Sequence, residues 1–404
     1  MQTNLAPKIQ QSPHAEAIDT ILRKCVHCGF CNATCPTYQI RGDELDGPRG
    51  RIYQMKQFFE GEPANAQMLK HLDRCLTCRA CETTCPSGVQ YSHLLEIGKE
   101  SIEQELPRPW WDRARRWGIV RFINSGWLFA LSIRMGQAFA WMLPSTLKES
   151  VPMRQVPVER INTAHARKVL MLAGCVQPAL APNTNACASN LLNRFEIEVI
   201  EVPGNLCCGA AALHTSEPKY AMGQVKKLID SWWPHIEAGV EAVVVTATGC
   251  GVSVKDYGRL LANDPDYANK AKTVSSLYCD LIELVGAEVE QFQAGILPAK
   301  RVAVHTPCTM QHGLGINHRV EALLAKAGYE ICEVEEAHLC CGSAGTYSML
   351  QPTMAEQLRT NKIRALSVNQ PDVIATANIG CQLHLAQSNK IPVVHWIELL
   401  QTAH

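Results

Sequence analysis

The sequence lacks an excess of charge and lacks a recognisable export signal. Its 404 residues contain 38 Lys and Arg and 38 Asp and Glu, so the formal net charge is zero. Proteins that bind nucleic acid usually carry a basic surplus, and this balance argues against nucleic acid as a partner. The first ten residues, MQTNLAPKIQ, lack the apolar core of a secretory signal. We therefore expect a cytoplasmic protein in a reducing compartment, where disulfides are rare.

Signatures of nucleotide and flavin binding are also missing. No strand pattern is followed by G-x-G-x-x-G, and no Walker A motif occurs. The stretch GLGINH at residues 313–318 lacks the third glycine. We therefore expect no flavin in this chain, and we expect that the chain does not oxidise an organic substrate by itself.

Cysteine, in contrast, is abundant, with 19 residues in one chain. Residues 25–36, CVHCGFCNATCP, and residues 75–86, CLTCRACETTCP, both fit C-x2-C-x2-C-x3-C-P. This is the run of bacterial ferredoxins, in which three thiolates bind one cluster and the fourth binds the other cluster. Structural zinc normally uses two separated C-x2-C pairs, which fits these runs poorly. The pattern predicts two [4Fe–4S] clusters, the first bound by Cys25, Cys28, Cys31 and Cys85, and the second by Cys75, Cys78, Cys81 and Cys35.

Helical patterns precede and separate the two cysteine runs. The segment between them contains GDELDGPRGRIYQMKQFFEG, in which a helix is expected from Arg49 to Glu60. These features predict an all-helical domain that holds both clusters. Arg49 and Arg51 either offset the charge of the clusters or simply lie at a solvated helix start.

The remainder of the chain contains a hidden repeat. From residue 169 onwards, strand and helix patterns alternate, which predicts α/β units with parallel strands. In each unit a cysteine is followed after 31 residues by Cys-Cys-Gly and later by a fourth cysteine, and the first three positions recur at an offset of 133 residues. The first set is Cys175, Cys207, Cys208 and Cys250, and the second is Cys308, Cys340, Cys341 and Cys381. Cys187, Cys279 and Cys332 fall outside the repeat and are interpreted as ordinary small apolar residues.

Each of these two sets has its cysteines after strands or in glycine-rich loops, where α/β folds place their sites. Each set could hold a metal, either a further iron–sulfur cluster or zinc. The second set has His305, His338 and His384 nearby in sequence, which allows a mixed Cys/His site. The first half carries Leu172, Asn205 and Ser253 at the corresponding places. The alternative is that Cys-Cys-Gly is only a tight turn with buried cysteines.

Residues 107–148 contain five of the eight tryptophans, together with six arginines and a single acid, Asp112. The longest uncharged apolar stretch there, FINSGWLFALSI, has twelve residues and is too short to span a bilayer. Tryptophan with arginine suits a helix that lies in a membrane interface. The alternative is an amphipathic helix that packs on this protein or on a partner.

The two cysteine runs, DELDGPRGRIY, the paired CCG motifs and TANIGCQLHLA together resemble the iron–sulfur subunit of bacterial glycolate oxidase. The resemblance covers nearly the whole chain and is weakest between residues 107 and 160. It implies a multidomain protein, with a helical two-cluster ferredoxin-type domain at 1–106, a linker at 107–160, and two α/β CCG domains at 161–295 and 296–404. CCG motifs of the heterodisulfide reductase type end in C-x2-C, whereas the last pairs here are Cys250 with Ser253 and Cys381 with His384.

The resemblance also implies a function. Separate flavin-binding subunits would oxidise glycolate to glyoxylate, and D-lactate as well, and this subunit would pass the electrons to a respiratory acceptor such as quinone. It would be part of an enzyme without being catalytic alone, on the cytoplasmic face of the inner membrane as a peripheral protein. Alternatives are the iron–sulfur subunit of a lactate or anaerobic glycerol-3-phosphate dehydrogenase, a stand-alone thiol/disulfide redox enzyme that uses the CCG sites, and a scaffold that only docks partners.

Overall fold

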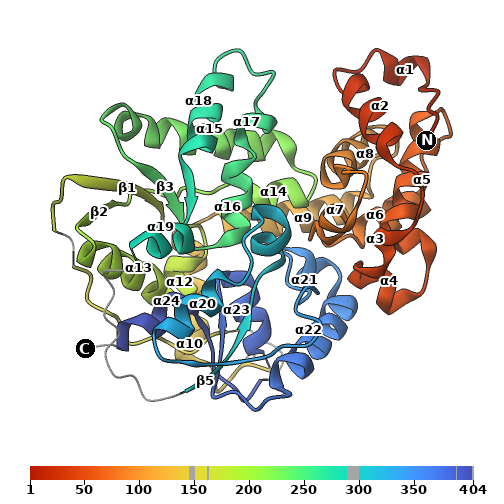
Figure 1. Ribbon diagram of the computed structural model, residues 1–404. Coiled ribbons are helices and arrows are strands. Elements are labelled where there is room, and N and C mark those ends of the chain that lie inside the picture. The colour runs from red at the N-terminus through yellow and green to blue at the C-terminus, as the bar shows by residue number, and fades with distance from the viewer. Residues whose placement is uncertain (145–150, 162, 289–299, 388, 403–404) are drawn as a thin grey trace.

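The computed structural model describes residues 1–144, 151–161, 163–288, 300–387 and 389–402. Its N-terminal region is helical, and two parallel sheets follow it (Figure 1). The predicted boundary between the two α/β domains, at residues 295 and 296, lies outside the described residues.

The N-terminal region consists of short helices around the two cysteine runs. Its elements are α1 (Pro7–Gln10), α2 (Ala15–Lys24), α3 (Phe30–Ala33), α4 (Pro36–Arg41), η1 (Glu44–Asp46), α5 (Pro48–Phe59), α6 (Ala66–Asp73), α7 (Ala80–Thr84) and α8 (Tyr91–Glu105). Proline occupies the first turn of α4 and of α5, where its fixed φ and missing N–H cost nothing. Apolar side chains of α2, α5, α6 and α8 form the core of this region, which includes Leu22, Met55, Leu72 and Leu94.

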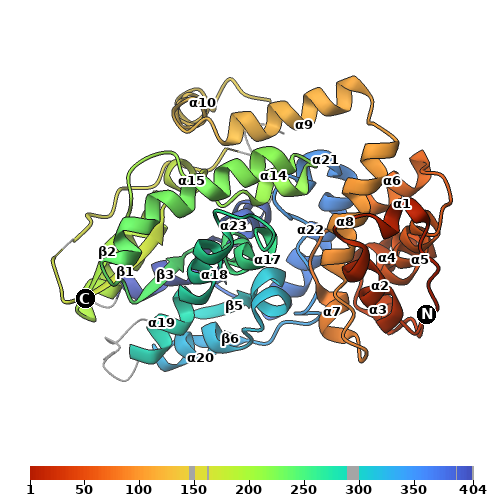
Figure 2. The ribbon, with the colours of Figure 1, turned by 90° about the horizontal axis from the view of Figure 1, so that it is seen from above.

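Two further helices, α9 (Trp110–Ile123) and α10 (Trp127–Ala138), follow α8. They run along one edge of the molecule, outside the sheets (Figure 2). Val120 of α9 is fully buried against Ala212 and Ala221. In the described part of the chain, no helix is both long and apolar enough to cross a membrane.

The first half of the repeat has a four-stranded parallel sheet in the order β2-β1-β3-β4. Its elements are β1 (Arg167–Leu172), α12 (Gln177–Leu180), α13 (Pro182–Arg194), β2 (Ile197–Ile200), α14 (Ala210–His214), α15 (Pro218–Glu237), β3 (Ala242–Val245), α16 (Thr248–Lys255), α17 (Tyr257–Leu260), α18 (Ala268–Leu277), β4 (Tyr278–Asp280) and α19 (Leu281–Glu288). Strands β1 and β3 are buried on both faces, as continuous apolar runs such as AVVV predict.

The second half repeats this order with the sheet β6-β5-β7-β8. Its elements are β5 (Arg301–His305), η3 (Thr309–Leu314), α20 (Arg319–Lys326), β6 (Glu330–Cys332), α21 (Tyr347–Leu350), α22 (Pro352–Ser367), β7 (Val373–Thr376), α23 (Ile379–Ala386), β8 (Val393–His395), α24 (Trp396–Leu399) and η4 (Leu400–Thr402). The alternation predicted from residue 169 onwards is therefore present. The short edge strands β4 and β8 were not predicted.

The two halves share one continuous core, in which residues of β1 and β3 lie in the same cluster as residues of β5, β7 and α24. Polar contacts join the two halves near the ends of their strands. The backbone N–H of Thr248 donates to the carbonyl of Ala377 at 3.2 Å, and His395 bonds through Nε2 to the carbonyl of Thr246 at 2.9 Å. The carboxyl ends of the two sheets therefore meet at the interface between the halves.

Candidate metal and electron-transfer sites

The two ferredoxin-type runs adopt the same backbone turn. His27 and Gly29 in the first run, and Thr77 and Arg79 in the second, all have positive φ, and a helix begins directly after each pair. Gly29, at φ 85°, also packs against an arginine, since a Cβ there would lie 2.6 Å from Nη1 of Arg49. The repeated left-handed positions turn each C-x2-C-x2-C segment back on itself, which brings its thiols together.

Each run lines a cavity that also receives a cysteine from the other run. Around the first cavity, which we call cluster site 1, lie Cys25, Cys28 and Cys31 together with Cys85, and Cys81 touches its wall. Around the second cavity, cluster site 2, lie Cys75, Cys78 and Cys81 together with Cys35. Burial, with the neighbouring thiol of Cys25 next, raises the pKa of Cys31 to about 11, so a metal must displace a proton to bind there. The thiol-lined walls fit an iron–sulfur cluster in both cavities.

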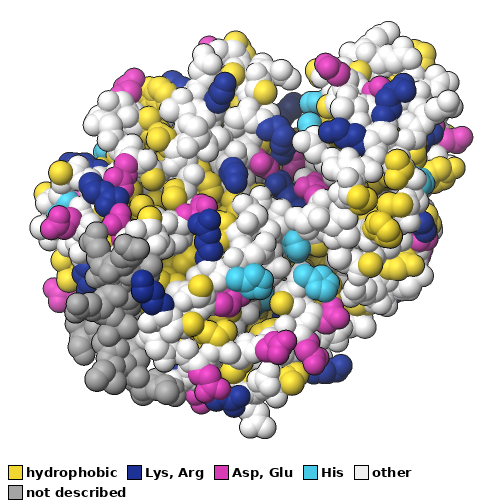
Figure 3. Space-filling view, viewed as in Figure 1, with side chains coloured by type: hydrophobic (Ala, Val, Ile, Leu, Met, Phe, Trp, Pro, Cys, Tyr) yellow, Lys and Arg dark blue, Asp and Glu magenta, His cyan; other side chains and the backbone are white. Residues whose placement is uncertain are grey.

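Cluster site 1 lies at the surface of the molecule. Cys28 is exposed, and Val26, Phe30 and Tyr53 expose large apolar side chains around it. Figure 3 shows hydrophobic side chains gathered over the N-terminal helices on this side of the molecule. An electron donor can therefore approach this site without any rearrangement of the chain.

Charged and polar groups surround cluster site 2. Arg51 is 1% exposed and donates to the hydroxyl of Thr37 at 3.1 Å, and that hydroxyl lies 3.2 Å from Sγ of Cys35. The hydroxyl of Tyr91 lies 3.6 Å from Sγ of Cys75. Arg51 is therefore no solvated helix start: it places a buried positive charge beside the thiols. Arg49, in contrast, is half-exposed and pairs with Glu44 at 2.6 Å.

The first CCG set is also assembled. Cys207 lies within hydrogen-bonding reach of Cys175 and of Cys208, and Cys208 within reach of Cys250. The N–H of Gly209 donates to Sγ of Cys207 at 3.5 Å. In the second half the N–H of Gly342 donates to Sγ of Cys340 at the same distance. The two halves therefore share the Cys-Cys-Gly turn, with φ of 84° at Gly209 and 90° at Gly342, and in both halves the turn serves to gather thiols.

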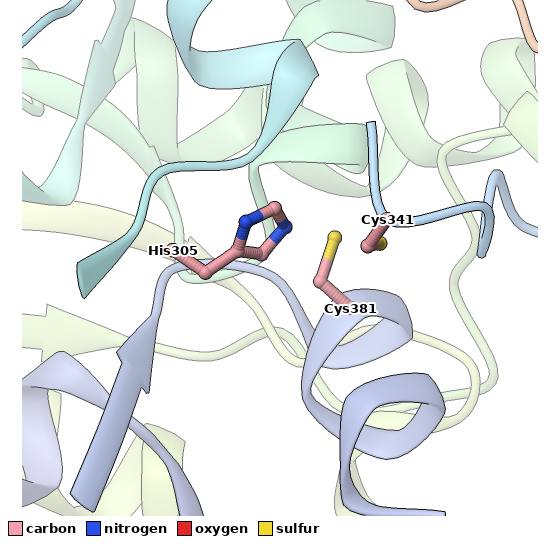
Figure 4. A group of neighbouring side chains, drawn as sticks. All are labelled: His305, Cys341 and Cys381. Atoms are coloured by element: carbon pink, nitrogen blue, oxygen red, sulfur yellow. The ribbon is translucent and has the colours of Figure 1, made fainter. Parts of the chain in front are cut away.

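The second CCG set forms a chain of thiols. Sγ of Cys308 lies 3.7 Å from Sγ of Cys340, and Cys341 lies within hydrogen-bonding reach of Cys340 and Cys381. His305, at the end of β5, points at Cys341 and Cys381 (Figure 4). One ligand atom from each of these three residues lies within 4.8 Å of the others. The donor set of two thiols and an imidazole suits zinc or iron.

The other two histidines do not join this group. His384 is buried, and its Nε2 lies 3.2 Å from the carbonyl oxygen of Ala355. His338 is at the surface, 3.7 Å from the carboxylate of Glu336. The group of close donor atoms therefore contains His305 and not the other two histidines: His384 lies on the same helix as Cys381 but turns to the carbonyl of Ala355, and His338 lies at the surface.

Two residues near the second set carried no clear signal in the sequence. The side chain of Asn378 donates to Sγ of Cys381 at 3.5 Å and accepts from the N–H of Gly249 at 3.2 Å, and it therefore connects the two halves. Lys362 is buried and donates to the carbonyl of Glu336 at 2.7 Å. The second half has TANIGC where the first half has TATGC, and this one-residue insertion was the sequence feature that could have drawn attention to Asn378. Nothing in the helix around Lys362 marks it.

Cluster site 2 lies beside the second CCG set. Cys78 and Cys308 pack against the same apolar cluster, which contains Leu76 and Cys340. Burial, and then the neighbouring thiol of Cys308, raises the pKa of Cys78 well above its ordinary value. The hydroxyl of Tyr347 donates to the carbonyl of Arg74 at 3.2 Å across this contact.

The first CCG set is placed differently. Among the described residues, the apolar cluster around Cys208 and Cys250 contains no cysteine of the ferredoxin-type runs. Within the described parts of the chain, the first half instead meets the N-terminal region through ion pairs, such as that of Arg79 with Asp256.

The three remaining cysteines are ordinary packing residues, as predicted. Cys187 lies in the core that the two halves share, Cys279 packs against the edge of that core, and Cys332 lies in the smaller core of the second half.

The linker helices are both packed and exposed. Arg108 and Arg116 of this segment bind Asp73 at 2.6 and 3.1 Å, and Arg121 stacks on the ring of Tyr220. These contacts fix α9 to the rest of the molecule, as the packing alternative expects. Large side chains of α9, of α10 and of the residues just after α10 are nevertheless exposed, namely Trp110, Trp111, Trp117, Trp127, Leu128, Leu131, Met135, Phe139, Trp141 and Met142. Lys148 of this segment lies outside the described residues.

Two family models match the chain. The 4Fe-4S dicluster domain matches residues 21–89, and the cysteine-rich CCG domain matches residues 169–255 and again residues 302–386. These matches confirm the two-cluster region and the duplication.

Several curated proteins are similar to the chain. The glycolate oxidase iron-sulfur subunit of Escherichia coli (strain K12) is 47% identical over 404 residues, which cover 100% of this chain and 99% of that protein. The probable glycolate oxidase iron-sulfur subunit of Bacillus subtilis (strain 168) is 29% identical, with 100% and 99% covered. Lactate utilization protein A of Bacillus licheniformis is 26% identical over 58% of this chain and 99% of that protein.

Proposed function

The chain belongs to the family of glycolate oxidase iron–sulfur subunits, which confirms the resemblance drawn from its motifs, and on this basis we propose how it carries electrons in such a complex. Oxidation of a 2-hydroxy acid to a 2-oxo acid, as from glycolate to glyoxylate or from D-lactate, releases two electrons and two protons. A flavin in a partner subunit can accept both electrons and pass them on singly. This chain is then the iron–sulfur component of the enzyme, and it has no activity towards glycolate on its own.

The observation that supports the proposal is that the fourth cysteine of each run lines the cavity of the other run. We propose that Cys25, Cys28, Cys31 and Cys85 hold one [4Fe–4S] cluster and that Cys75, Cys78, Cys81 and Cys35 hold the other. A cluster bound in either cavity would accept and donate one electron at a time. The first three thiols of each run would hold one cluster, and the cysteine before Pro36 or Pro86 would supply the fourth ligand of the neighbouring cluster. Because Cys28 is exposed and Cys78 is covered by the second half, the flavin subunit would dock over cluster site 1.

The same proposal gives each segment a task. Residues 1–106 hold the two clusters, residues 107–160 attach the subunit, and the domains at 161–295 and 296–404 carry the CCG sets. We propose that the exposed tryptophan face of α9 and α10 lies in the interface of the inner membrane on its cytoplasmic side, with quinone or another respiratory acceptor nearby. The exposed rings support this, since tryptophan favours the membrane–water interface. A partner helix on the same face is the alternative.

The experiment is the substitution Cys35→Ser in the purified complex. Electron paramagnetic resonance of the reduced complex should show that the cluster of Cys75, Cys78 and Cys81 is altered while the cluster of Cys25 is retained. Electron flow from glycolate to the acceptor should fall by more than the about 10- to 100-fold that is typical of losing a hydrogen-bond partner of a ligand. The matched control is Cys279→Ser, which changes a cysteine outside all four sets and should leave both signals intact.

Damage confined to the Cys25 cluster would refute the exchanged ligands. A second assay separates the subunit from a stand-alone enzyme. The purified chain alone, given glycolate and an artificial dye, should be inactive, and added flavin subunits should restore activity. Activity of the chain alone would exclude the proposed role.

A further inference from the structure

His305 is buried and has no hydrogen-bond partner within the part of the chain that the structure describes. It ends β5, so its side chain lies at the carboxyl edge of the second sheet, where parallel folds place their sites. The residue is 2% exposed, and neither ring nitrogen has a hydrogen-bond partner among the described residues. Buried polar groups are normally paired, and an unpaired imidazole therefore needs an explanation.

The atoms in front of the ring are sulfur. Ligand atoms of His305, Cys341 and Cys381 lie within 4.8 Å of one another, and all three residues are buried. A metal bound by the imidazole and the two thiols would satisfy all three groups.

We propose that the second half holds an iron–sulfur centre in which His305 supplies a nitrogen ligand beside the thiolates of Cys341 and Cys381. Neither the two ferredoxin-type sites nor the paired cysteine sets include this ligand. The proposal rests on the proposed function only for the direction of electron flow, because the ligand set follows from the geometry alone.

Iron fits this set better than structural zinc does. A closed zinc site has four ligands, whereas Cys308, Cys340, Cys341, Cys381 and His305 offer five in one continuous chain. The far end of that chain, Cys308, lies beside Cys78 of cluster site 2. A redox-active centre at this place could exchange electrons with cluster site 2, whereas a zinc ion there could not.

The first half cannot form the same centre. Leu172 ends β1 where His305 ends β5, and it offers no donor atom. The two halves therefore differ in chemistry although they share the fold. Histidine ligation is associated with a higher reduction potential of an iron–sulfur centre, because imidazole is a neutral ligand, and the buried charge of Lys362 near His305 acts in the same direction. We therefore expect the His305 centre to be reduced more easily than the two clusters of the N-terminal region.

The test uses the full-length chain, purified without oxygen after expression with iron. Two [4Fe–4S] clusters account for about eight iron atoms per chain, and we expect iron in excess of that content. His305→Leu, which installs the residue of the first half, should remove part of the excess and leave the signals of the two N-terminal clusters unchanged. His338→Ala is the control, because it removes a surface histidine of the same half, and it should change neither quantity.

A second variant and a spectroscopic measurement keep the test decisive. His305→Cys should retain the excess iron, because cysteine is also a ligand, but should lose the magnetic coupling to nitrogen that chains labelled with 15N-histidine reveal in pulsed resonance. This variant also decides the matter if His305→Leu does not fold. Three results would each overturn the proposal. The wild-type chain could contain about eight iron atoms and no more, or it could contain zinc in place of the excess iron. The nitrogen coupling could also persist in His305→Cys.

Discussion

Asp46 offers a sharp test of how the N-terminal region is held together. Its carboxylate is fully buried and faces four basic side chains, at 2.8 Å from His71 and Arg74, 3.6 Å from Arg41 and 3.7 Å from Arg51. Its backbone carbonyl accepts from the hydroxyl of Thr37 at 2.8 Å. These contacts tie the loop between the two runs to the residues that flank Cys35 and Cys75.

The substitution Asp46→Asn removes the negative charge and leaves the guanidinium of Arg51 buried without its carboxylate. Breaking a buried ion pair in this way costs about 3–5 kcal/mol. We expect the lower end, about 3 kcal/mol, because Arg51 keeps its bonds to the carbonyl of His71 at 2.8 Å and to Thr37. This corresponds to a loss of about two orders of magnitude in the ratio of folded to unfolded protein. If the region of residues 1–106 unfolds as a unit, its melting temperature should fall by about 10 °C or more.

The assay follows the visible absorption of the clusters while the anaerobic protein is heated. Asp19→Asn is the control, since Asp19 pairs with Arg23 on the surface and its loss should be small. The double variant Asp46→Asn with Arg51→Met should melt above the single variant, because it removes the stranded charge as well. Two results would show that this network does not stabilise the region. One is that Asp46→Asn melts at the same temperature as the wild type. The other is that the double variant loses as much stability as Asp46→Asn and Arg51→Met lose together when each is measured alone.

Two further predictions concern the linker face and the pH dependence of stability. Trp127 and Trp141 are 69% and 78% exposed. Replacing both with Ser should move the complex from the membrane fraction to the soluble fraction without loss of cluster absorption. Unchanged fractionation would indicate that this surface binds a partner helix instead. Burial raises the pKa of Asp280 from 3.8 to about 6, so the folded state binds a proton more tightly than the unfolded state, and stability should fall as pH rises from about 4 to about 6 and stay level above. Asp280→Asn should remove this loss, which is about 3 kcal/mol in full. Chemical unfolding measured between pH 4 and 7 checks it, and parallel curves for both proteins would contradict the assignment.

Local sequence patterns were sufficient to predict much of the secondary structure and the cysteine motifs of this protein. The spacing of cysteines in each run is read within twelve residues, and the left-handed turns at His27, Gly29, Thr77 and Arg79 follow that same short range. The strands of the repeat were visible because buried parallel strands are continuous apolar runs. The duplicated Cys-Cys-Gly turn was visible because its glycine is required by the backbone, since a Cβ at Gly342 would lie 2.7 Å from Leu358. The sequence by itself therefore determined the family, the two motif types and the order of strands and helices.

Tertiary packing decided which of these residues meet. His305, His338 and His384 looked equivalent in the sequence, but only His305 ends a strand at the carboxyl edge where Cys341 and Cys381 lie. Nothing local shows that Cys78 packs beside Cys308, since 230 residues separate them along the chain and the contact depends on how the N-terminal region docks on the second half. Burial of Arg51 likewise depends on Asp46 and Thr37 closing around it. Periodicity shows which face of a helix or strand is buried. Which other element covers that face depends on packing between segments far apart in the sequence, so no short segment predicts it.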